Sequence, residues 1–353
     1  MKKIISFLNT DIKIINSYFL FTIVLIILVC VGYTSYALFS FTKTSNNVIE
    51  GTVGELKKSG ADTLIKLTNN QNDSGLYTIT HPADSTLQIG ATESVTEYRY
   101  RGASPKNYVT FNNEVWRIIG IFPTDDGNGN IENRIKLIRN ESIAPQKWNT
   151  TKVSSTSTYN NWTGATLQIY LNGDYYNSLI DTSQSMISSL KYYLGGHASY
   201  LIDTSQMYKN ERKINGGTYY YGTNPNNWIG KIGLMYLSDY GYASANCEGK
   251  VTYDTQSSSN DLRACNDTNW LYNLKVNEWL LPQYSEAGSG SYYSFFVYSD
   301  GHVYPRDVRS SQSAVRPTLY LKSNVKITGG DGTSSSPYTL GLWSISLDLV
   351  NLT

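Results

Sequence analysis

The sequence predicts an α+β domain that is rich in antiparallel strands and short helices and that follows one apolar N-terminal helix. Two hairpin signals support the β-rich class, because Asn112-Asn113 and Asp300-Gly301 each separate two apolar or aromatic runs. Helical periodicity is confined to short stretches in the middle of the chain. The 353 residues suffice for one large domain or two modest ones.

The N-terminal segment indicates the compartment. No charged residue occurs between Lys13 and Lys43, and residues 18–33 are apolar enough to enter a bilayer. Lysines precede this segment, so the positive-inside rule places the N-terminus in the cytoplasm and the rest outside. Ser35-Tyr36-Ala37 is also an acceptable cleavage site. We therefore expect an extracytoplasmic protein that is anchored in the cell membrane by this helix, or secreted if it is cleaved after Ala37.

Composition shifts divide the rest of the chain. We expect a signal peptide or signal anchor over residues 1–40, a polar stalk over 41–96, the α+β domain over 97–340 and a C-terminal tail over 341–353. Net charge is only +1 and charged residues make up 16% of the chain, so no nucleic-acid partner is expected. The 30 tyrosines fit pleated surfaces, and most of them are expected to pack between strands.

The first strands are expected in a meander. Tyr108 to Phe111 and Glu114 to Phe122 form the predicted hairpin through Asn112-Asn113, with Trp116 apolar, and residues 131–139 form a third strand. The loop between them carries oxygen side chains and glycines in the style of a calcium site. The loop lacks the full ligand pattern, so a plain loop is favoured and a weak Ca²⁺ site is the alternative; its candidate ligands are Asp125, Asp126 and Asn128. No other cofactor or metal is expected.

Short helices follow. Leu167, Tyr170 and Leu171 share one helical face. Leu-Ile-Asp-Thr-Ser-Gln occurs at 179–184 and again at 201–206, and each copy is interpreted as a helix start with Asp and Thr at the N-cap. Residues 192–196 are expected to end the first of these helices. Residues 228–243 are expected to form a buried strand that leads into a Ser-Asp-Tyr-Gly turn.

The closing part of the chain is the most informative. Trp279 to Leu281 reads as a buried strand, and a Ser/Gly loop over 285–291 follows it. The Asp300-Gly301 hairpin joins 295–298 to 302–304, and its alternation would send Phe295 and Val297 to one face and Phe296 and Tyr298 to the other. One more strand, over 315–321, opens with Arg316 and a proline. We expect Arg316 to be a structural fork that is satisfied by backbone carbonyls or a carboxylate.

This order of elements resembles a domain-of-unknown-function family of extracytoplasmic proteins in low-GC Gram-positive bacteria. That family usually closes with W-W-L-R-S-P, then D-G-x-V, then V-R-P-A-L. Here Leu280-Leu281-Pro282 stands where the family has Leu-Arg-Ser-Pro, so the family's arginine is missing, whereas Asp300-Gly301 and Val315-Arg316-Pro317 match. Residues 98–102 and 107–119 resemble the usual opening. The resemblance implies a C-type-lectin-like or formylglycine-generating-enzyme-like architecture, and it implies no reaction.

The cysteines fit an oxidising compartment. Cys247 and Cys265 lie in a loop-rich, exported region, where a disulfide is the expected state. A metal pair is disfavoured, because none of the three histidines stands at ligand spacing from these cysteines.

No motif for nucleophilic, zinc-dependent or phosphate chemistry is present in the sequence. His302 is interpreted as an exposed hairpin histidine. We expect a cell-surface binding or adhesion module that recognises a glycan or a protein without catalysis, because aromatic rings among Asn, Ser and Gly give adaptable polar contacts with rigid anchors. The expected ligand contacts are Tyr292, Tyr293 and Tyr304. An extracellular enzyme of unknown reaction is the alternative, and a structural component of a surface fibre or matrix is a second alternative.

Overall fold

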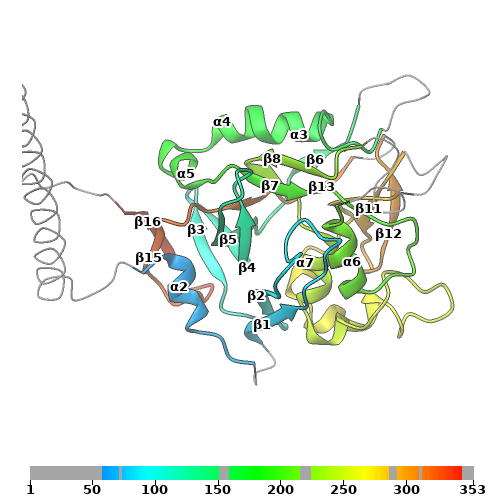
Figure 1. Ribbon diagram of the computed structural model, residues 1–353, viewed down its shortest axis with the longest axis horizontal. Helices are drawn as coiled ribbons and strands as arrows, with labels where there is room; N and C mark the ends of the chain where they lie inside the picture. Colours follow the sequence, from blue (N-terminus) through cyan, green and yellow to red (C-terminus); the bar gives the residue numbers. More distant parts are fainter. Residues whose placement is uncertain are drawn as a thin grey trace, which may run out of the picture. The chain divides into compact units, whose positions relative to one another are not determined.

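A computed structural model describes residues 58–70, 74–150, 159–214, 224–285, 292–309 and 312–343 (Figure 1). These residues belong to one compact unit that begins at Lys58. None of the helices in this part of the chain has the length and apolar character that a membrane crossing requires. The expected N-terminal membrane or signal helix lies outside the described residues.

The larger sheet is antiparallel throughout and has seven strands. Its order is β1 (Gly75–His81), β2 (Val95–Arg101), β4 (Glu114–Asp125), β5 (Ile131–Arg139), β14 (Thr318–Tyr320) and β9 (Ile232–Gly233), and β3 (Tyr108–Phe111) pairs with β4. Asn112 and Asn113 both have φ near +57° (56° and 58°), as the hairpin turn between β3 and β4 requires. The predicted β3–β4–β5 meander is therefore confirmed.

A second, five-stranded sheet contains the closing hairpin. Its order is β12 (Val303–Asp307), β11 (Tyr293–Val297), β10 (Glu278–Gln283), β13 (Ser313–Val315) and β6 (Ile143–Gln146), and only the β10–β13 pairing is parallel. Two further strand pairs are β15 (Val325–Gly329) with β16 (Thr339–Leu342), and β7 (Leu190–Tyr193) with β8 (Asn227–Gly230). The predicted α+β class with antiparallel sheets is confirmed at this level.

Short helices cover the sheets. In Figure 1, α3 (Thr166–Tyr170), α4 (Tyr176–Ser178) and α5 (Asp181–Met186) run along the upper margin, and the π-helical turn η1 (Leu171–Tyr175) joins α3 to α4. The predicted helix is confirmed, because Leu167 and Leu171 are both buried. The remaining helices are α2 (Gly60–Ile65), α6 (Thr204–Glu211), α7 (Leu237–Tyr242), η3 (Ala245–Cys247), η4 (Leu262–Thr268) and η5 (Trp270–Tyr272).

The two copies of the hexapeptide differ in structure. In the second copy, the Asp203 carboxylate accepts the backbone N–H of Gln206 at 2.9 Å and caps α6, as predicted. In the first copy, the helix begins at Asp181 itself, and its N-cap is Ile180, which makes no side-chain cap. The expectation that residues 192–196 end this helix is wrong, because α5 ends at Met186 and residues 190–193 form strand β7. Pairing with β8, more than thirty residues later, determines that strand.

Two other local predictions need correction. Ser238 to Gly241 was expected as a turn but lies within helix α7, whose first turn is fixed by the Asp239 carboxylate accepting the Tyr236 N–H at 2.9 Å. The expected strand over 315–321 is two strands, β13 and β14, which lie in different sheets. Arg316 and Pro317 form the crossing between them, because proline lacks the N–H that a continuous ladder would need.

The segment expected as a polar stalk is folded from residue 58. Ser59 caps α2 by accepting the Asp62 N–H at 3.0 Å, and β1 pairs with β2 over its whole length. Leu76 and Tyr77 on β1 are buried, which an unpacked stalk would not allow. At the other end, β16 continues two residues beyond the expected boundary at 340.

Candidate functional site

The closing hairpin, β11–β12, turns at Asp300-Gly301 as the sequence predicts. Phe296 pairs with Tyr304, and the Gly301 N–H donates to the Tyr298 carbonyl at 2.8 Å. Gly301 has φ +93°, and a Cβ there would lie 2.0 Å from the Asn266 side chain. Conformation and space therefore both require glycine at this turn.

Five aromatic rings gather beside this turn, and we call them the hairpin platform: Tyr200, Tyr253, Tyr298, His302 and Tyr304. Ring centroids lie 4.7 Å apart for Tyr200 and Tyr304, 5.4 Å for Tyr253 and Tyr304, and 4.3 Å for Tyr253 and His302. Tyr298 stacks on His302 at 4.3 Å with an interplanar angle of 11°. All five side chains are partly exposed. The platform is therefore a continuous aromatic surface that is open to solvent at its edge.

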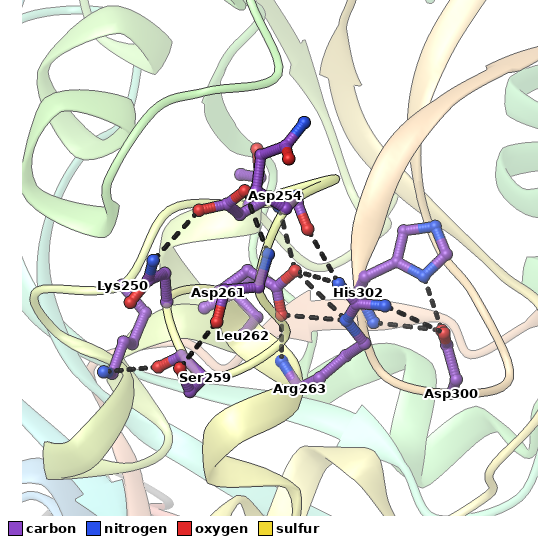
Figure 2. A network of polar contacts seen from close by, with 12 residues as sticks. Lys250, Asp254, Ser259, Asp261, Leu262, Arg263, Asp300 and His302 are labelled. Carbon is purple, nitrogen blue, oxygen red and sulfur yellow. Dashed lines mark hydrogen bonds and ion pairs between the residues drawn. The ribbon is translucent and has the colours of Figure 1, made fainter.

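Several charged side chains lie beside this platform and form ion pairs with one another (Figure 2). Figure 2 shows Arg263 between the carboxylates of Asp261 and Asp300, with the ring of His302 above the Asp300 carboxylate. The Arg263 guanidinium donates to Asp261 at 2.6–3.1 Å, lies 3.9 Å from Asp300 and has its carbon 5.0 Å from the centre of the Tyr253 ring. Its hydrogen bonds with Asp261 raise the pKa of Arg263, so the cation is permanent.

The orientation of His302 is set by its neighbour. Its Nδ1 lies 2.5 Å from Oδ1 of Asp300, whose side chain is 52% exposed. Burial lowers the pKa of His302, although the Asp300 carboxylate raises it in part. Nδ1–H therefore donates to Asp300 in the neutral imidazole, and Nε2 is left as the acceptor.

A disulfide fixes helix η4 beside the site. Cys247 and Cys265 are bonded, with Cα atoms 5.6 Å apart, and both are buried. Cys265 lies in η4 two residues after Arg263, and Asn266 of the same helix donates to the Asp300 carbonyl at 2.6 Å. The cross-link thus fixes the helix that supplies the guanidinium and supports the hairpin turn.

The three tyrosines expected at the ligand do not form one group. Tyr304 belongs to the hairpin platform, whereas Tyr293 faces Tyr284 at 6.4 Å and Tyr292 lies 4.9 Å from Tyr159. All three are partly exposed. Phe295 and Val297, expected on one face of the hairpin, and Phe296, expected on the other, are all buried, so β11 is covered on both faces. The loop expected beside them lies outside the described residues over 286–291.

Arg316 forms a buried fork. Its guanidinium donates to both carboxylate oxygens of Glu278 at 2.7 Å, to Asn273 Oδ1 at 2.6 Å and to the Leu271 carbonyl at 2.8 Å. Arg316 is 1% exposed and Glu278 is 3% exposed. The expected acceptors, a carboxylate and a backbone carbonyl, are thus both present, and both charged groups are buried. Trp116 and Trp279 are likewise fully buried.

The carboxylates of the candidate calcium loop are used within the protein. Asp125 accepts backbone N–H groups of Gly127 and Gly129 and pairs with Lys191. Asp126 accepts from Asn128 and Asn130, and the side-chain bond from Asn130, followed by the backbone bonds, lowers its pKa to about 2. No group of three or more His, Cys, Asp or Glu side chains that could hold a metal ion occurs among the described residues. The geometry is that of a turn whose acidic residues cap its own backbone.

A fully buried ionic network lies between the large sheet and α6–α7. Its members are Glu97, Arg99, Lys136, Glu211, Arg212 and Asp239, three acids and three bases that are each at most 4% exposed. Asp239 on α7 links that helix to the large sheet, because it accepts from Arg99 on β2 at 2.8 Å and from Lys136 on β5 at 2.5 Å. Burial raises the pKa of Asp239, but Lys136 and Arg99 outweigh that effect and hold it below its ordinary value. The network is enclosed and neutral, so it fits a structural role.

Two open hollows lie away from the hairpin platform. One, of about 540 Å³, lies beside α3 and includes Lys147 and Asp174, and the other, of about 600 Å³, lies between α2 and the β15–β16 pair. Among the residues that the structure describes, the lining of neither hollow includes stacked rings or an ion pair. The hairpin platform is therefore the stronger candidate site.

Comparisons with models of protein families, with curated proteins and with solved structures found no match to this chain. Sequence reasoning found Tyr304, Asp300 and Gly301 but missed Tyr200, Tyr253 and Arg263. For Arg263, the only local signal was its proximity to Cys265 in the sequence. For Tyr200 and Tyr253, the sequence contains no signal that separates them from the other tyrosines among the thirty.

Proposed function

We propose that this protein is an extracytoplasmic binding module of the cell surface that recognises a neutral glycan on the hairpin platform and does not alter it chemically. The platform itself carries the proposal, because five touching, partly exposed rings lie beside fixed hydrogen-bonding groups. The negative face of an aromatic ring attracts the C–H hydrogens on the apolar face of a sugar. The Asp300 carboxylate and Nε2 of His302 can then accept bonds from its hydroxyl groups.

The charges of the site favour a neutral ligand over an acidic one. The carboxylates of Asp254, Asp261 and Asp300 in the network of Figure 2 outnumber its two cations, Lys250 and Arg263, and the lowered pKa of His302 keeps its ring neutral near pH 7. An anionic sugar would meet net repulsion here. A neutral polyol gains bonds from the same groups without that cost.

The cell-surface location in this proposal depends on the sequence. The apolar N-terminal segment and the lysines before it support export, with the membrane as a partner. Membership of the Gram-positive family with a lectin-like architecture is likewise part of the proposal, and the closing Asp300-Gly301 and Val315-Arg316-Pro317 pattern supports it. Two mainly antiparallel sheets with short helices are compatible with that architecture.

A glycan array tests the proposal. We expect the full-length protein in detergent to bind neutral glycans, and Tyr253→Ala to weaken binding about tenfold, as the loss of 1.4 kcal/mol would. Tyr253→Phe should keep the affinity within a few fold. Tyr170→Ala is the matched control, because that tyrosine lies on α3 and its ring contacts Tyr175. No glycan binding by the wild type, or equal losses for Tyr253→Ala and Tyr170→Ala, would contradict the proposal.

An extracellular enzyme is the second candidate, and the Asp300–His302 pair favours it. A carboxylate on Nδ1 orients an imidazole so that Nε2 can act as a general base. His302→Phe separates the two functions, because it keeps a ring in the platform and removes the base. Time-dependent conversion of a bound glycan that is seen by mass spectrometry with the wild type and lost in His302→Phe would identify an enzyme.

A further inference from the structure

A second aromatic cluster lies at the opposite end of the closing hairpin. It consists of Tyr159, Tyr292 and Arg309, and we call it the far platform. The two tyrosine rings lie 4.9 Å apart at 38°, and the Arg309 guanidinium carbon lies 4.0 Å from the centre of the Tyr292 ring and 5.0 Å from that of Tyr159. All three side chains are partly or largely exposed.

The arginine of the far platform is held in place. Asp307 accepts two bonds from the Arg309 guanidinium, at 3.0 and 2.7 Å, and one from its backbone N–H at 2.9 Å. The hydrogen bonds with Asp307 raise the pKa of Arg309 and offset its charge. The far platform is thus a preorganised, nearly neutral stack of two partly exposed rings and an exposed guanidinium, the same combination of groups as at the hairpin platform.

Strand register fixes the spacing of the two platforms. Tyr304 of the hairpin platform pairs with Phe296, and the carbonyl of Tyr292 in the far platform accepts the Val308 N–H at 2.8 Å. Four residues along the chain therefore separate Tyr304 from Val308, which is about 13 Å at the rise of a β-strand. A single six-membered sugar ring cannot contact both platforms, but consecutive rings of one chain can.

The strand that joins the platforms lies at an edge. β12 is the outermost strand of the five-stranded sheet, and Figure 1 shows β11 and β12 at the right margin of the molecule. One aromatic platform thus stands at each end of this edge strand, whose residues are buried or partly buried and whose Val303 N–H donates to the Thr252 carbonyl at 3.0 Å. A linear ligand that lies along β12 can reach both without any change in the fold.

We propose that the ligand is a linear neutral oligosaccharide of several units that spans the hairpin platform and the far platform along β12. This inference rests on the proposed function and specifies its substrate class as a polymer rather than a single sugar. Two linked contacts bind more tightly than either alone, because the second contact forms within the complex at a high effective concentration. Affinity therefore rises with chain length until both platforms are covered, and then levels off.

The test uses soluble β-1,4-linked oligomers of N-acetylglucosamine, of glucose and of mannose, from one to six units, titrated into the full-length protein in detergent. We expect affinity in at least one series to rise about tenfold or more as the chain lengthens. The double variant Tyr159→Ala/Tyr292→Ala should lose that gain while it keeps the affinity for the shortest bound oligomer. The Tyr159→Phe/Tyr292→Phe variant keeps both rings and should retain the gain, and matching melting temperatures show that the variants are folded.

The outcomes separate the two proposals. Binding that does not change with length, or a gain that survives in the alanine double variant, overturns the two-platform inference and leaves the glycan function standing. A Tyr253→Ala variant that binds every oligomer as tightly as the wild type overturns the hairpin platform instead. No binding of any of the three series by the wild type overturns both.

Discussion

Removing the fork of Arg316 is the sharpest test of what holds the two sheets together. Arg316→Ala leaves Glu278 in the core without its guanidinium, and it also removes the donors to Asn273 and the Leu271 carbonyl. Because Glu278 is only 3% exposed, water cannot replace the lost partner without a rearrangement. Breaking a buried ion pair in this way costs about 3–5 kcal/mol.

This cost is a large part of the total stability of a domain, which is about 5–15 kcal/mol. For a unit of this size we expect a fall in Tm of roughly 10 °C, at about 2–4 °C for each kcal/mol. Urea unfolding followed by tryptophan fluorescence gives the same quantity as a shift in midpoint. The double variant Arg316→Ala/Glu278→Gln should recover part of the loss, because a neutral amide is less costly to bury than a carboxylate.

Arg309→Ala is the matched control. Arg309 also holds a carboxylate with two bonds, but its side chain is 42% exposed. Exposed ion pairs contribute about 0–1 kcal/mol, so this variant should unfold almost where the wild type does. Equal losses for the two variants, or less than about 1 kcal/mol for Arg316→Ala, would refute the argument from burial.

Four other changes have defined outcomes. Cys247→Ser/Cys265→Ser should cost about 3 kcal/mol of unfolding free energy, and peptide mass spectrometry under non-reducing conditions that finds both thiols free would remove the basis for this expectation. Burial raises the pKa of Glu97, but Arg99, His81 and Arg212 together hold it below the ordinary 4.5. Its ionised form therefore contributes stability that is present above pH 4.5 and is lost as the pH falls further. Below pH 4.5, the urea midpoint of Glu97→Gln should decline less steeply with pH than that of the wild type. Millimolar Ca²⁺ should leave Tm unchanged, because the Asp125 and Asp126 carboxylates already accept hydrogen bonds within the loop. An upward shift in Tm that is abolished by Asp126→Asn would instead show that the loop binds calcium. Tyr272→Phe removes the 2.7 Å hydrogen bond from the tyrosine hydroxyl to the Ser299 carbonyl. Amide hydrogen exchange at the hairpin turn should therefore become faster, with little change in Tm. Unaltered exchange would show that the turn is held without this bond.

Local patterns predicted the elements that local chemistry determines. The Asn112-Asn113 and Asp300-Gly301 turns were predictable because only a few residue types tolerate positive φ. Helix α3 was predictable because Leu167 and Leu171 follow helical spacing. Strand β7 was not, since its residues acquire strand structure by pairing with β8 across a long intervening segment.

The same division applies to the candidate site. Tyr304 was found because it belongs to the hairpin, whereas Tyr253 and Arg263 come from the segment that the disulfide closes and Tyr200 from the loop before α6. Nothing in the spacing of these residues indicates that they meet. The buried ionic network was also missed, because a charged residue on a strand looks like a solvated one until the other elements cover it.

The position of Arg316 explains how the core and the candidate site depend on each other. Its bonds to the Leu271 carbonyl and to Asn273 hold both neighbours of Tyr272, whose hydroxyl donates to the Ser299 carbonyl at the hairpin turn. The same guanidinium holds Glu278 on β10, the strand beside β11, at the point where the chain crosses from one sheet to the other. The geometry of the platform therefore depends on an ion pair that is buried in the core. It follows that variation at the exposed rings can change which ligand is bound, whereas a change at Arg316 alters the frame on which every ring is held.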